Sequence, residues 1–162
     1  MELSEAIASD HQLARLLQIG IVLEEVVEAR AEAHLETLDT DADAAVVELL
    51  EEAAAESHDH RDRLTALVAS LEAEPTPFAE VEALVRERYA RTEPEDFDDL
   101  LYDQLCNEET AYKFYDDLIT AIEASDIEFS IDREYLLSVL REIREEEKEG
   151  VEEVTRLMET RA

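Results

Sequence analysis

Apolar residues recur along this chain every three to four positions, in four long stretches separated by polar turns. This spacing places the apolar side chains on one face of an α-helix. No stretch alternates between apolar and polar residues with period two, so we place no β-strands. The pattern predicts an all-α protein, a bundle of four long helices in a single domain that spans residues 1–162.

Polar residues and prolines set the expected ends of the first two helices. Ser4 is a candidate N-cap for a helix that reaches about Leu38. The polar segment 39–43 then supplies a turn and a new N-cap, and the second helix runs from there to about Ala73, ahead of Pro75. Because the turn is short, these two helices form an antiparallel hairpin.

A long connection separates this hairpin from a second one. Within it, residues 78–89 are expected to form a short helix. A third long helix is expected from about Phe97 to Ala124, and Ser130 or Asp132 can cap a fourth that almost reaches the end of the chain. The prediction is therefore two helical hairpins joined by one long crossover, whereas a simple up-and-down bundle would need only short loops.

The charge balance is strongly negative, with 45 Asp and Glu residues against 14 Lys and Arg and a formal net charge of -31. Since 46% of the residues are hydrophobic and follow a helical period, we expect a folded protein with a carboxylate-covered surface. Such charges repel one another over roughly 30 Å at 0.01 M salt but only about 3 Å at 1 M. Together with the scarcity of lysine (Lys113 and Lys148 only), this composition resembles that of proteins from salt-accumulating archaea.

Several function classes are disfavoured. The acidity argues against nucleic acid and anionic membranes as partners. Cys106 is the only cysteine, so the chain cannot build an internal disulfide or a zinc knuckle. The first residues lack the order of a signal peptide, and the longest apolar run, residues 16–23, is too short to span a bilayer. We expect a cytoplasmic protein.

Charged residues inside the apolar faces are the candidate functional groups. Each residue turns a helix by about 100°, which places one or two such residues within or beside the apolar face of each long helix. An ionised carboxylate in a core needs a proton, a cationic partner or a metal ion. Oxygen and imidazole ligands from facing helices suit iron or manganese. The candidate metal ligands are Glu28, Glu56, His60, Glu108, Glu146 and Glu147.

One of these residues opens a recognisable motif. Residues 108–115 read Glu-Glu-Thr-Ala-Tyr-Lys-Phe-Tyr, with Ala three positions after the first Glu and an aromatic pair six and seven positions after it. This segment resembles the third helix of rubrerythrin-type proteins of the ferritin-like superfamily. The same spacing is repeated on the first helix by Glu28, Ala31, His34 and Leu35. The resemblance implies a ferritin-like bundle whose paired carboxylates hold two iron ions that reduce oxygen or peroxide.

The match to the di-iron ligand set is incomplete. Di-iron members carry Glu-x-x-His on the second and fourth helices, but here Ser57 replaces that Glu and Gly150 replaces that His. Carried over residue by residue, the surviving ligands are Glu28, His60, Glu108 and Glu147. These four ligands are enough for one metal ion, or for two if Glu56, Glu146 or Glu24 is recruited.

Two functional hypotheses follow. The first is a ferritin-like metal-binding protein that handles iron and oxygen or peroxide, with manganese or zinc as alternative metals and with turnover left open. The second is a metal-free bundle that serves as a structural or interaction module, which Ser57 and Gly150 favour. An apolar flank on the first helix, formed by Leu16, Leu23 and Val27, indicates either a homodimer seam or burial under the crossover.

The remaining chemically active side chains receive a structural interpretation. The other histidines are expected at the surface or at helix ends. The third-helix tyrosines lie within the apolar face, which predicts core packing. One thiol supports no mechanism by itself. The residues concerned are His11, His34, His58, Tyr112, Tyr115 and Cys106.

Overall fold

A computed structural model of the chain describes residues 7–38, 44–74, 79, 83 and 97–160. These residues form four long α-helices and, over the same ranges, no strand, which confirms the all-α four-helix prediction. The helices are α1 (Asp10–Thr37), α2 (Ala44–Ala69), α4 (Phe97–Ala124) and α5 (Arg133–Glu159).

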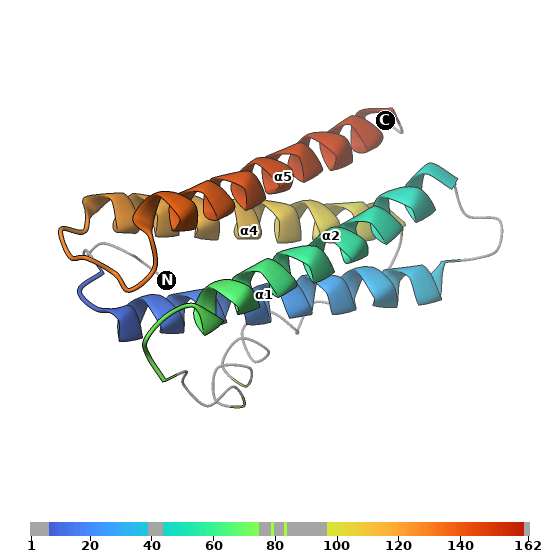
Figure 1. Cartoon of the computed structure of the whole chain (residues 1–162). Helices are drawn as coiled ribbons and strands as arrows, with labels where there is room; N and C mark the ends of the chain where they lie inside the picture. Colours follow the sequence, from blue (N-terminus) through green and yellow to red (C-terminus); the bar gives the residue numbers. More distant parts are fainter. Residues whose placement is uncertain (1–6, 39–43, 75–78, 80–82, 84–96, 161–162) are drawn as a thin grey trace.

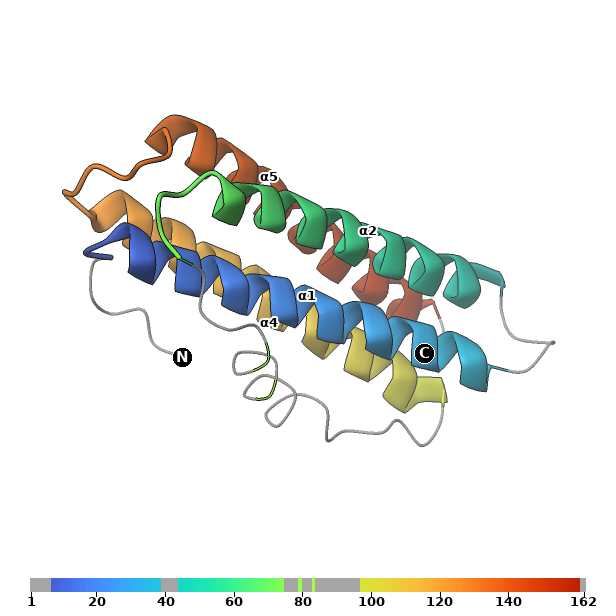
Figure 2. The same cartoon turned by 60° about the horizontal axis from the view of Figure 1, so that its bottom comes forward.

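The helices pack as two antiparallel pairs, α1 with α2 and α4 with α5 (Figure 1). The pairs meet through α1 against α4 and α2 against α5, so each helix has two neighbours and one diagonal partner. Turning the molecule shows the same order (Figure 2). α2 and α4 run in the same direction, and the end of α2 therefore lies at the opposite end of the bundle from the start of α4.

Side-chain caps fix two helix starts. The backbone N–H of Gln12 donates to Ser9 Oγ at 3.2 Å, so α1 begins at Asp10 and not after Ser4 as we expected. The N–H of Tyr135 donates to Asp132 Oδ2 at 3.1 Å, which confirms Asp132 as the cap of α5. α2 ends at Ala69, four residues before the expected Ala73.

The predicted connection is largely outside the described residues. Of the short helix expected over residues 78–89, the structure describes residues 79 and 83 alone.

The apolar flank of α1 lies within the described residues. Leu23 and Val27 are buried within the single chain, so their burial does not require a second copy. In the described ranges, no helix has the length and apolarity needed to cross a membrane.

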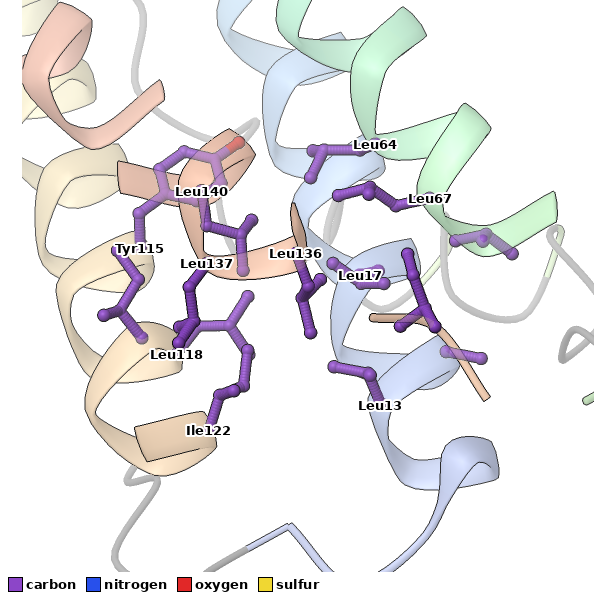
Figure 3. Packing of buried hydrophobic residues seen from close by; sticks show 14 of the residues in the cluster. Leu13, Leu17, Leu64, Leu67, Tyr115, Leu118, Ile122, Leu136, Leu137 and Leu140 are labelled. Carbon is purple, nitrogen blue, oxygen red and sulfur yellow. The ribbon is translucent and has the colours of Figure 1, made fainter. Parts of the chain in front are cut away.

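Two apolar layers fill the bundle, one toward each end. The larger layer packs residues from all four helices, and Figure 3 shows Leu17, Leu67, Leu118 and Leu136 converging there. The smaller layer joins Ala31, Val46, Leu50, Leu100 and Leu101 at the other end. Between these layers, each helix carries a short polar segment.

Candidate metal centre

The polar segments of all four helices meet in one buried layer. The side chains at its centre are almost fully buried, with residue exposures of 0% for Glu24 on α1, 0% for His60 on α2, 6% for Glu108 on α4 and 3% for Glu147 on α5. Such complete burial of three carboxylates is unusual without a compensating cation or proton. Glu56 and Glu146 lie half-buried at the edge of the layer.

His60 lies at the centre of this layer. Its Nδ1 is 3.3 Å from Glu24 Oε1 and 3.1 Å from Glu147 Oε1. Its Nε2 contacts the carboxylate of Glu146 and lies 3.9 Å from Glu56 Oε1. An ionised carboxylate only accepts hydrogen bonds, so an imidazole facing ionised carboxylates on both sides must carry a proton on each nitrogen.

Neighbouring side chains fix the carboxylates. The Tyr115 hydroxyl donates to Glu24 Oε1 at 2.6 Å, and Gln104 Nε2 donates to Glu108 Oε1 at 2.9 Å. At the edge of the layer, Arg63 Nη2 donates to Glu146 Oε1 at 3.2 Å. Tyr115 and Gln104 are both buried, so these hydrogen bonds hold the acceptors in fixed orientations.

Gly150 on α5 makes room for the carboxylate of Glu108. A Cβ atom at this position would lie 2.6 Å from Glu108 Oε2 and 2.9 Å from its Cδ. Any larger residue here would therefore displace the Glu108 side chain. Gly150, which stands where the di-iron pattern has a histidine, thus leaves the space that the Glu108 carboxylate occupies.

The carboxylates have strongly altered proton affinities. Burial raises the pKa of Glu147 well above its usual range, and the nearby Glu24 and Glu108 raise it further. Burial also raises the pKa of Glu108, although the hydrogen bond from Glu147 opposes that rise. Burial and the charge of Glu108 raise the pKa of Glu56 to about 8.

His60 is shifted by opposing causes. Burial by itself lowers its pKa, but the hydrogen bond and charge of Glu24, together with Glu146 and Glu56, outweigh burial and raise the pKa to about 9. Bound protons therefore offset part of the negative charge of the layer near neutral pH.

The donor atoms fall into three overlapping groups, each with three ligand atoms within 4.8 Å of one another. One oxygen of the first group, Glu24 Oε2, is buried and accepts no hydrogen bond from the described residues. A buried anionic oxygen without a partner fits a site for a cation, and the oxygen and imidazole donors fit a divalent metal. The groups are Glu24, His60 and Glu147; Glu56, His60 and Glu146; and Glu56, Glu108 and Glu147.

Of the six predicted ligands, Glu28 lies outside these groups. It forms ion pairs with Arg61, at 3.1 Å between Oε2 and Nη2, and with His58, at 3.6 Å between Oε1 and Nδ1. Glu24, one helical turn earlier, takes the place we expected Glu28 to occupy. The other five, Glu56, His60, Glu108, Glu146 and Glu147, come together.

A second buried ionic cluster, formed by His34, Arg30 and Asp103, was not foreseen from the sequence. His34 lies in the last turn of α1, at a helix end as we expected, but it is buried there, and its Nε2 lies 2.7 Å from Asp103 Oδ2. Arg30 also binds Asp103, with its Nε donating to Oδ2 at 3.1 Å. Arg30 and His34 lie four positions apart on α1, but their partner Asp103 is on α4, so no local spacing reveals the cluster.

Comparisons of the chain with models of known protein families, with curated proteins and with solved structures found no match. The functional assignment therefore depends on the chemistry of the buried layer itself.

Proposed function

We propose that this protein binds a divalent metal ion in the core of its helical bundle. The observation that carries the proposal is the buried Glu24 Oε2, which lacks a hydrogen-bond partner in the described residues, within a layer where carboxylates outnumber the single imidazole. A divalent cation would neutralise this excess negative charge, and metal sites of bundles are built from facing helices in this way.

The first group of donors is the primary site. Glu24, His60 and Glu147 are all buried and come from three different helices, so the fold fixes them before a metal arrives. Glu108 and Glu56 add oxygen donors around Glu147 and would complete the coordination of this ion or hold a second one.

Iron with oxygen or peroxide is the chemistry we propose for the site, in a ferritin-like protein. Three features support this reading. Each of the four helices contributes a Glu or His to the buried layer. α2 and α4 run in the same direction, as two helices joined by a long crossover would, and residues 108–115 carry the motif described above. Bound iron would supply one-electron chemistry toward oxygen or peroxide, while the carboxylates hold it in the water-poor core.

Anaerobic titration with Fe(II) in concentrated KCl tests the proposal. We expect saturable binding of one or two ions, and Glu24→Gln should weaken it at least about tenfold, since an isosteric amide removes the anionic oxygen. Glu28→Gln is the matched control, because Glu28 lies one turn further along α1 and is paired with Arg61. Equal binding by both variants would contradict the assignment of Glu24, and no binding by the wild-type protein would refute the metal site.

A second candidate is a metal-free structural or interaction module. The raised pKa values of Glu147 and Glu56 favour it, because protons can neutralise the layer without any metal. This reading predicts an unchanged melting temperature after Fe(II) is added. If iron does bind, consumption of peroxide by the loaded protein separates an enzyme from a passive binder.

A further inference from the structure

Two neighbouring residues, Gln104 and Gly150, fix the position of the Glu108 carboxylate in the layer. Glu108 projects from α4 toward α5, where Gly150 leaves the space that its carboxylate fills. One oxygen of that carboxylate accepts a hydrogen bond from the buried Gln104, and the other lies against Gly150. Gln104 thus binds one oxygen of the carboxylate, and the missing side chain of Gly150 leaves room for the other.

This arrangement changes the balance of donor types. With Glu108 in place, the layer offers carboxylates from Glu24, Glu56, Glu108 and Glu147 against the single imidazole of His60. Hard cations such as Mn²⁺ and Mg²⁺ prefer oxygen donors and about six ligands. Zn²⁺ is satisfied by about four ligands and accepts imidazole readily. An added carboxylate therefore benefits a six-coordinate ion more than it benefits Zn²⁺.

We propose that Gly150 and Gln104 are specificity-determining residues, which seat Glu108 as an additional oxygen ligand and so shift the site toward hard, six-coordinate divalent cations and away from Zn²⁺. This inference rests on the proposed metal-binding function. It assigns selectivity to a glycine that contacts no metal itself, through the room that it leaves for a neighbouring carboxylate.

The Gly150→Ala variant tests the inference. The added methyl group would push the Glu108 carboxylate out of its place, while Ala favours the helix more than Gly does. We expect the metal-free variant to melt at or above the wild-type temperature, yet to bind Mn²⁺ about 10- to 100-fold more weakly. Zn²⁺ affinity should fall less, because Glu24, His60 and Glu147 remain. The measurement is competition of each metal with a chromophoric chelator in concentrated KCl.

Two further variants complete the design. Gly20→Ala is the matched control: a Cβ there would lie 3.0 Å from the Phe114 ring, in apolar packing. It should leave the ratio of Mn²⁺ to Zn²⁺ affinity unchanged. Glu108→Gln removes the anionic oxygen without added bulk and should change the ratio in the same direction as Gly150→Ala.

The outcomes separate the two claims. Wild-type protein that binds neither metal overturns both the proposed function and this inference. Wild-type protein that binds metal, with an unchanged affinity ratio in Gly150→Ala and Glu108→Gln, overturns the selectivity role alone. A shifted ratio in both variants but not in Gly20→Ala supports it.

Discussion

At the level of single residues, His60 is the side chain that offsets the negative charge of the surrounding carboxylates. Among the described residues, it is the only imidazole in contact with both Glu24 of α1 and Glu147 of α5, and it is buried between them. In the absence of metal it acts as the internal cation of the layer. Binding of the proposed metal to the imidazole would displace a proton and would thereby link stability and metal content through pH.

This linkage gives a pH dependence with a definite sign. The folded protein holds a proton on His60 up to a pKa of about 9, against 6.5 for an ordinary histidine, and on Glu56 up to about 8, against 4.5. Between pH 7 and 9 the metal-free fold therefore binds more protons than the unfolded chain, and its stability falls as pH rises.

We expect the melting temperature of metal-free protein, measured with a chelator present, to drop between pH 7 and 9. Anaerobic Mn²⁺-loaded protein should show a smaller drop, because the metal replaces these protons. The His60→Gln variant should lose most of the difference between the two conditions. A metal-free melting temperature that rises over this range would contradict the charge balance described for the layer.

At the level of helices, a second ionic cluster joins α1 to α4. Asp103 is buried and binds Arg30 and His34 together. Burial by itself would raise the pKa of Asp103, but the hydrogen bonds and charges of His34 and Arg30 outweigh burial and lower it. This carboxylate therefore stabilises the fold above the ordinary aspartate pKa of 3.8, and that contribution is lost as pH falls below it.

Asp103→Asn should destabilise the protein by about 3 kcal/mol near neutral pH, since it leaves Arg30 and His34 without their anionic partner in a buried place. Asp117→Asn on the same helix is the control, because the Lys113–Asp117 pair is exposed and contributes less than about 1 kcal/mol. Urea unfolding at pH 7 measures both. Equal effects of the two substitutions would show that the buried cluster contributes no more than a surface pair.

The helices themselves could be predicted from the sequence, whereas their axial alignment could not. Periodicity located four helices and placed His60, Glu108 and Glu147 on or beside their inward faces, and the structure places these three residues in one layer. Glu24 and Glu28 differ by only about 40° around α1 and about 6 Å along it, so both lie on the same face of the helix. Which of them meets His60 depends on how α1 slides against α2, and no local sequence signal sets that distance.

The burial of His34 was missed for a related reason. Its partner Asp103 is 69 positions away on α4, so the pairing becomes visible only when the two helices are docked. The space that Gly150 leaves for Glu108 was likewise not visible in the sequence. Taken alone, a glycine at the position of a histidine ligand indicates that a metal ligand has been lost.

For the whole molecule, the feature with the widest physical consequence is the formal net charge of -31. Like charges spread over the surface oppose the compact state, and salt shortens their reach from about 10 Å at 0.1 M to about 3 Å at 1 M. We expect the melting temperature to rise steadily as KCl increases from 0.1 to 2 M. Sucrose at equal osmolality should have a smaller effect, since it leaves the charges unscreened. A melting temperature that does not change with KCl would refute the interpretation of the surface as adapted to salt.

Elemental analysis of wild-type protein, purified in concentrated KCl without chelator, tests whether the buried carboxylate layer is a metal centre. We expect iron or manganese at close to one or two ions per chain, retained through gel filtration. A protein that contains no transition metal after such purification, and that takes up none from Fe(II) or Mn²⁺ added under anaerobic conditions, would contradict the metal centre and leave a bundle neutralised by protons.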